Sequence, residues 1–306
     1  MSDLLDKKLV FVTGKGGVGK STVALSLGLA GAARGKRTLV CEIASQENAS
    51  RVFKRAQVGF NEVELTPGLW GISIDPDESM REYLLLQLKV KAMRDLLMRS
   101  KLFRYLAQAA PGLKELVTIG KIWELTLPDR KVKGMEPYDL VIVDAPATGH
   151  GIGFLQTPRT FAEIARVGPI HNQASTLDAQ ITNHEETGVA IVALPEEMPV
   201  NESASLETQL IDDVGVAVDR LYMNALYPNL FTDTEAETLA GMRESAEGPT
   251  RAAITAAMSE HKRATVQQAQ LERLKEMTRT PVTELPFIFK PQLDLGDFNE
   301  LSELTV

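Results

Sequence analysis

Between two apolar segments, the sequence contains the run Gly14-Lys-Gly-Gly-Val-Gly-Lys-Ser21. The β-branched residues 8–13 come before it, and residues 38–43 form a similar run further along the chain. Both runs are typical of strands that are buried on both faces of a sheet. Residues 23–33, which lie between them, follow a helical pattern. This order of strand, glycine-rich loop, helix and strand predicts a βαβ unit of a parallel sheet.

The glycine-rich run matches the pattern G-x-x-x-x-G-K-[ST], and it lies between a strand and a helix, as that pattern requires. Glycines let backbone N–H groups approach a phosphate closely, and the following helix adds the positive end of its dipole. We therefore expect a phosphate-binding loop (P-loop). In such a loop Lys20 reaches the β- and γ-phosphates, and the hydroxyl of Ser21 binds Mg²⁺.

Several other segments have the apolar, β-branched composition of strands: 139–143, 188–194, 216–223, 281–285 and, more weakly, 62–66 and 69–74. Residues 76–127 and 249–279 have helical patterns. Strands alternating with helices predict a three-layer α/β fold, with a mostly parallel sheet covered by helices and joined by right-handed crossovers. No long linker divides the chain. We expect one domain over residues 1–306, with a helical insertion at 76–127.

Composition narrows the class of protein. The 306 residues are 44% hydrophobic and 24% charged, as in a globular protein with an ordinary core. No window approaches 18 uninterrupted apolar residues and the N-terminus lacks the apolar part of a secretion signal, so we expect a cytoplasmic protein without a transmembrane segment. The single cysteine, Cys41, excludes intramolecular disulfides and sites built from cysteine pairs, including zinc and iron–sulfur sites, and it argues against an arsenite site built from thiolates.

Lys15 extends the loop pattern beyond a general P-loop. With it, the run resembles the deviant Walker A pattern K-G-G-x-G-K-[ST] of the MinD, ParA, nitrogenase iron-protein and ArsA-type ATPases. The resemblance implies that ATP bridges two subunits and that Lys15 crosses the dimer interface to contact the partner's nucleotide; the alternative is a solvated loop lysine. The nucleotide-binding residues expected in the loop are Gly14, Gly16, Gly17, Val18, Gly19, Lys20, Ser21 and Thr22.

A second segment, Asp144-Ala-Pro-Ala-Thr-Gly-His150, directly follows a predicted strand. In α/β folds a carboxylate at this place lies beside the phosphate loop, where Mg²⁺-linked water is held. The segment resembles the D-T-A-P-T-G-H signature of the ArsA and guided-entry (tail-anchored-protein targeting) ATPases, in a bacterial single-domain form. That resemblance implies that Asp144 senses the γ-phosphate through Mg²⁺, which makes Ser21 and Asp144 the expected metal site.

The segment that follows the second strand departs from the family. Aligned with the ParA-type pattern L-L-I-D-x-D-P-Q-x-N-x-[ST], Glu42 takes the first acidic position, and Ala44 falls where the aspartate that orients the attacking water is expected. An alanine side chain cannot accept a hydrogen bond from water. Three explanations remain open: Glu42 or Glu47 orients the water instead, the partner subunit supplies the group that does so, or hydrolysis is slow. Glu42 itself has two equal interpretations: a catalytic carboxylate, or a structural one that accepts a hydrogen bond from a backbone amide.

The resemblance also implies an adenine site: Asn224 at the end of a predicted strand would bind the base, with Pro286 and Phe287 in the loop beside it. Asn224 could instead only form a turn. The expected catalytic residues are Lys15, Lys20, Glu42 and Asp144.

The function that these motifs imply is a dimeric, Mg²⁺-dependent ATPase that binds ATP and ADP. The partner subunit is a second copy or a paralogue. Segment 80–106 contains Met80, Met93 and Met98 among leucines, and its residues 81–104 include seven basic and two acidic ones. The segment either packs on the sheet or binds a hydrophobic client, and its basic face suits a membrane surface or an anionic partner.

Three other functions remain open: a nucleotide-binding scaffold with slow or no hydrolysis, a ParA- or MinD-like positioning factor, and an ATP-using ligase. The net charge of −8 argues against DNA binding. The cysteine count excludes a redox iron protein.

Overall fold

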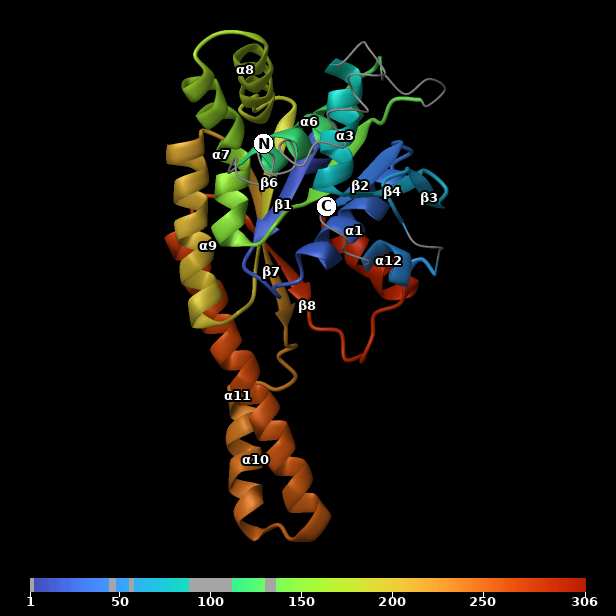
Figure 1. Cartoon of the computed structure of the whole chain (residues 1–306). Helices are drawn as coiled ribbons and strands as arrows, with labels where there is room; N and C mark the ends of the chain where they lie inside the picture. Colours follow the sequence, from blue (N-terminus) through green and yellow to red (C-terminus); the bar gives the residue numbers. More distant parts are fainter. Residues whose placement is uncertain (1–2, 44–47, 55–57, 88–111, 130–135) are drawn as a thin grey trace.

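A computed structural model describes residues 3–43, 48–54, 58–87, 112–129 and 136–306. In these residues eight strands form one sheet in the order β3-β4-β2-β5-β1-β6-β7-β8 (Figure 1). All neighbouring pairs are parallel except β3 and β4. The strands are β1 (Leu9–Gly14), β2 (Thr38–Ile43), β3 (Val63–Thr66), β4 (Leu69–Ile74), β5 (Leu140–Asp144), β6 (Thr187–Ala193), β7 (Val218–Leu226) and β8 (Val282–Pro286).

The predicted three-layer α/β fold is confirmed. The central strand β1 is buried along its whole length, and its alternate residues belong to different clusters. Val10 and Val12 pack with α1 (Lys20–Ala33) and α12 (Leu295–Leu304) on one face, whereas Leu9 and Phe11 belong to the cluster of the other face. That second cluster is formed with α6 (Leu113–Thr126), α7 (Thr148–Ala165), α8 (Pro169–Ile181) and α9 (Glu197–Gln209) (Figure 1).

The described part of the expected insertion is helical. It consists of α3 (Pro76–Gln87) and α6, which pack against each other. Segment 88–111 lies outside the described residues, and Met93, Met98 and most of the basic side chains of 81–104 lie outside them too. The short elements are η1 (Leu4–Asp6), α2 (Asn48–Val52) and η2 (Leu210–Val214).

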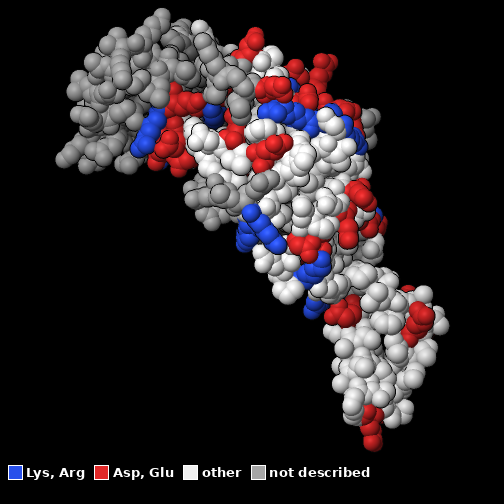
Figure 2. Space-filling view, turned by 90° about the vertical axis from the view of Figure 1, so that its right-hand side faces the viewer, with Lys and Arg blue, Asp and Glu red and all other residues white. Residues whose placement is uncertain are grey.

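The helical pattern at 249–279 is α11 (Gly248–Met277), which forms a hairpin with α10 (Asp233–Ser245). The 30 residues of α11 span about 45 Å. Leu271 and Leu274 near its C-terminal end are buried in the core, whereas α10 and the N-terminal part of α11 extend beyond the sheet (Figure 1). The face of the hairpin turned to the viewer in Figure 2 is largely uncharged. No helix in the described ranges is both long and apolar enough to cross a bilayer.

Candidate functional site

The glycine-rich run forms a tight loop between β1 and α1. Gly14 pairs with Val192 of β6, and α1 begins at Lys20. Gly17 and Gly19 have left-handed backbone conformations, with φ of +83° and +96°. A Cβ atom on Gly19 would lie 2.2 Å from Nδ2 of Asn224, so position 19 demands glycine for its conformation and for the space. Val18 between them is buried in the core and anchors the loop.

Lys20 lies at the first turn of α1, where its Nζ donates a hydrogen bond to the carbonyl oxygen of Lys15 at 2.9 Å. Burial lowers the pKa of Lys20, and the nearby charge of Asp144 opposes that shift. Thr22 follows in the same turn, and Gly16 lies on the side of the loop that faces Ala147. The expected loop residues are thus gathered around one point at the N-terminus of α1.

The two residues expected to bind Mg²⁺ lie in contact. Parallel pairing places Asp144, the last residue of β5, beside Val12 of β1, and Oγ of Ser21 donates to its Oδ2 at 2.5 Å. Asp144 is 1% exposed. Burial raises its pKa, although the Ser21 hydrogen bond and the charge of Lys20 lower it.

The same pair fits a hard cation. The Oδ1 atom of Asp144 is buried and has no hydrogen-bond partner among the residues that the structure describes. A carboxylate and a hydroxyl are the oxygen ligands that Mg²⁺ prefers, and the cation usually retains water and phosphate oxygens as its other ligands. The buried Oδ1 is therefore an oxygen suited to a metal ion or to a metal-bound water.

Lys15 does not extend freely into solvent. Its Nζ forms an ion pair with Oε1 of Glu202 in α9 at 2.7 Å, and both side chains are about one-third exposed (36% and 34%). Sequence reasoning gave Glu202 no role. The two residues are 187 positions apart, and no motif spacing indicates such a contact.

Glu42, the last but one residue of β2, is buried beside Asp144 in the adjacent strand β5. Its Oε1 accepts a hydrogen bond from the backbone N–H of Ala49 at 3.0 Å. The structure thus contains the contact with a backbone amide that the sequence left open as one alternative. Ala44 and Glu47 lie outside the described residues.

Asn224 contacts the loop itself: its Nδ2 donates to the carbonyl oxygen of Val18 at 2.9 Å. The sequence predicted a base contact and gave no sign of this bond. Pro286 pairs with Leu226 at the ends of β7 and β8, and Phe287 stacks on Tyr227 with ring centroids 4.7 Å apart. Phe287 and Tyr227 line a groove of about 610 Å³ whose far side is formed by α11, including Arg263 and Gln267.

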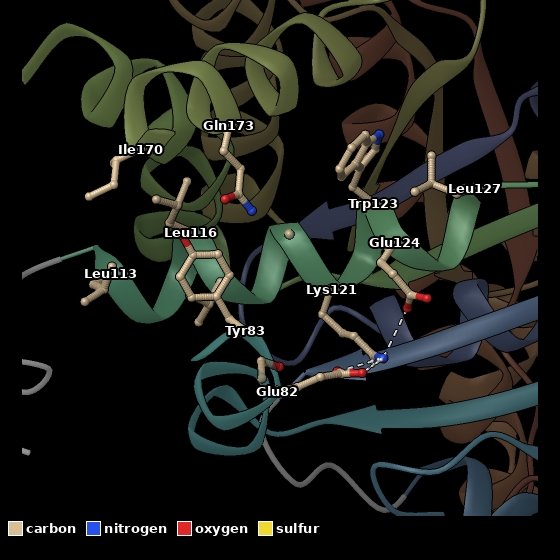
Figure 3. Close-up of a pocket in the computed structure, with 13 residues that line it drawn as sticks. Glu82, Tyr83, Leu113, Leu116, Lys121, Trp123, Glu124, Leu127, Ile170 and Gln173 are labelled. Atoms are coloured by element: carbon tan, nitrogen blue, oxygen red, sulfur yellow. Dashed lines mark hydrogen bonds and ion pairs between the residues drawn. The ribbon is translucent and has the colours of Figure 1, made fainter. Parts of the chain in front are cut away.

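A second cavity, of about 130 Å³, lies between α3, α6 and α8 (Figure 3). Its apolar lining includes Leu113, Leu116 and Val117 of α6. One wall is polar: Nζ of Lys121 lies 2.8 Å from Glu82 and 3.2 Å from Glu124. Helix α6 thus presents one face to the core through Ile119 and Ile122 and another to this cavity.

Comparison with known proteins agrees with these motifs. A family model described as anion-transporting ATPase matches residues 7–175. The ATPase BagA of Mycobacterium tuberculosis is 26% identical over 99% of this chain and 93% of its own. The ATPase get3 of Schizosaccharomyces japonicus is 32% identical over 58% of this chain and 55% of its own. The arsenical pump-driving ATPase of Acidiphilium multivorum is 25% identical over 82% of this chain and 44% of its own.

The family match covers the P-loop, the segment that begins at Asp144, and more than half of the chain. The full-length similarity to an ATPase extends it over the remaining strands. On this evidence the chain belongs to the ArsA/Get3 family of anion-transporting ATPases, which are P-loop ATPases.

Proposed function

We propose that this protein is a Mg²⁺-dependent ATPase that works as a dimeric switch and couples its nucleotide state to a client bound at its helical region. One observation carries the catalytic part: Lys20, Ser21 and Asp144 converge at the N-terminus of α1, and one oxygen of Asp144 is buried without a partner among the described residues.

In this proposal the chain's own groups bind the triphosphate. The loop N–H groups and the positive end of α1 face the phosphates, and Lys20 leaves the carbonyl of Lys15 to contact them. Ser21 and Asp144 would hold Mg²⁺, which supplies positive charge beside the γ-phosphate. The burial of Asp144 excludes water and strengthens these charge interactions.

The dimeric part rests on Lys15. Its side chain is partly exposed on the loop, so an ammonium group can reach a second subunit that faces the nucleotide. An interface with two-fold symmetry would bring each Lys15 to the nucleotide of the other subunit. A homodimer and a heterodimer with a paralogue both satisfy this geometry.

The client part rests on the cavity of Figure 3 and its surroundings. Ile170 lines the cavity and is 51% exposed, and Ile164 and Val167 at the same turn between α7 and α8 are 74% and 81% exposed. An apolar surface next to an apolar cavity is typical of a binding site. A hydrophobic segment of another protein is the client that this surface suits.

A nucleotide-binding scaffold with slow hydrolysis is the second candidate, and Ala44 in place of the expected aspartate favours it. Ala44→Asp should raise phosphate release if a missing carboxylate limits turnover. A measurable rate of phosphate release that Ala44→Asp leaves unchanged would mean that another group already orients the water, which would count against the scaffold.

The nucleotide site is tested by ligand-induced stabilisation. At a Mg-ATP concentration of 100 Kd, binding should stabilise the folded chain by about 2.7 kcal/mol and raise the thermal midpoint. Lys20→Ala should lose this shift, whereas the control Lys275→Ala, which removes an exposed lysine of α11, should retain it. An equal shift in the two variants would refute the role of Lys20.

A further inference from the structure

Both lysines of the phosphate loop have partners within their own chain. Nζ of Lys20 donates to the carbonyl oxygen of Lys15, and Nζ of Lys15 is paired with Glu202 at 2.7 Å. Each lysine would give up its partner on contacting phosphate: Lys20 for its own nucleotide, and Lys15 for the nucleotide of a facing subunit. Because Lys20 bonds to the backbone of Lys15, its departure also releases the loop at that residue.

Glu202 belongs to a helix that is firmly attached to the rest of the chain. The neighbouring Asn201 accepts a hydrogen bond from Nη2 of Arg273 in α11 at 2.7 Å. One turn and a half further on, the buried carboxylate of Glu207 accepts from the backbone N–H of Thr280 at 2.8 Å. These bonds fix α9 to α11 and to the segment before β8. The backbone of α9 at Glu202 is therefore held in place, and from this position the carboxylate of Glu202 holds the ammonium group of Lys15 toward its own subunit.

We propose that Glu202 is a positioning residue that retains Lys15 on its own subunit until ATP-driven dimerisation transfers Lys15 to the partner's nucleotide. The inference rests on the proposed dimeric function and adds to it a residue outside the phosphate loop and the segment that begins at Asp144. Glu202 opposes ATP-driven dimerisation, because each Lys15 must leave a carboxylate before it can cross the interface to the partner's nucleotide.

The exposure of the pair sets the size of the effect. Both side chains are about one-third exposed (36% and 34%), and ion pairs of that kind contribute about 0.2–1 kcal/mol. That range corresponds to a factor of about 1.4 to 5 in an equilibrium constant. A symmetric dimer releases two such pairs, so the dissociation constant of the dimer should change by the square, about 2- to 30-fold. The contact therefore raises the dissociation constant of the dimer without preventing dimerisation.

The test is the dissociation constant of the dimer, measured by sedimentation velocity with Mg²⁺ and a slowly hydrolysed ATP analogue. Glu202→Ala should lower this constant by about 2- to 30-fold, Glu202→Gln should lower it by less than Glu202→Ala, and Glu202→Asp should restore it toward the wild-type value. In a Lys15→Ala background the Glu202→Ala change should have no effect. High salt should shrink the difference between wild type and Glu202→Ala, because an exposed ion pair is screened.

The outcomes separate the inference from the proposed function. If Lys15→Ala weakens the dimer but the Glu202 variants leave it unchanged or weaken it, the positioning role of Glu202 is wrong and the dimeric function stands. The inference is equally overturned if Glu202→Ala tightens the dimer as much without Lys15 as with it. If the wild type forms no ATP-driven dimer, or Lys15→Ala dimerises as well as wild type, the role of Lys15 across the interface fails, and the inference fails with it.

Discussion

Two glycines of the phosphate loop offer a matched comparison. Gly17 and Gly19 have similar left-handed φ values, +83° and +96°. A Cβ atom at Gly17 would meet nothing within 4 Å, whereas one at Gly19 would lie 2.2 Å from Nδ2 of Asn224. Substitution by alanine therefore imposes the same backbone strain at both positions, and at Gly19 it also displaces a side chain.

The structure gives the size of each cost. An alanine in the left-handed region costs about 1–2 kcal/mol, which is the whole expected effect of Gly17→Ala. In Gly19→Ala the amide of Asn224 must also move, and its bond to the carbonyl of Val18 is lost. A neutral hydrogen bond contributes about 0.5–1.5 kcal/mol. Gly19→Ala should thus reduce the free energy of unfolding by about 1.5–3.5 kcal/mol.

Urea denaturation of the nucleotide-free protein measures both changes. Gly19→Ala should have the lower midpoint, and in an Asn224→Ala background the two alanine variants should become equally stable, because the side chain that clashes is gone. Equal midpoints of the single variants, or a difference that persists without Asn224, would refute the argument that Asn224 and Gly19 form one packed unit.

Three further perturbations follow from the site and the cavity. Burial raises the pKa of Asp144, so this carboxyl group keeps its proton to higher pH in the folded chain than in the unfolded chain. The unfolding free energy of the nucleotide-free protein should therefore fall as the pH rises from the ordinary pKa of an aspartate toward the raised one. In urea titrations, Asp144→Asn should lack that fall. If Asn224 only supports the loop, Asn224→Ala should weaken ATP and GTP binding equally in equilibrium dialysis, whereas a selective loss of ATP would indicate a base contact. Lys121→Ala leaves two carboxylates near an apolar cavity and should lower the unfolding free energy by about 3 kcal/mol. The control Lys114→Ala breaks an exposed ion pair and should lower it by less than about 1 kcal/mol. Equal losses would contradict the argument that burial makes the ion pairs of Lys121 important.

The sequence predicted the sheet well because its central strands β1, β2, β5 and β6 are buried on both faces. Each predicted strand is present, with ends that differ by up to three residues; the run 216–223, for example, corresponds to Val218–Leu226. Buried parallel strands require uninterrupted apolar residues, and such runs are visible without any alignment.

The two helices that come directly after Asp144, α7 and α8, were not predicted, for a physical reason. Helix α7 begins with Thr148-Gly-His-Gly151 and contains Pro158, so it has no clear helical pattern at its start. The hairpin partner α10 was also missed, because every one of its residues is at least partly exposed and no apolar stripe marks it.

The sequence motifs identified the residues of the candidate site but not the contacts between them. The spacing of glycines and lysines led to the loop, and strand order placed Asp144 beside Ser21. The bonds from Lys15 to Glu202 and from Asn224 to Val18 join residues 187 and 206 positions apart. Contacts of that kind depend on the packing of α9 and β7 around the loop, which local pattern does not encode.

The most direct test of the central claim is equilibrium dialysis of the wild-type chain against labelled ATP, with and without Mg²⁺. If the loop, Ser21 and Asp144 form a nucleotide site, close to one ATP should be retained per chain, more tightly with Mg²⁺, and Lys20→Ala should retain almost none. Retention of no nucleotide by the folded wild-type chain, or undiminished binding by Lys20→Ala, would contradict the account.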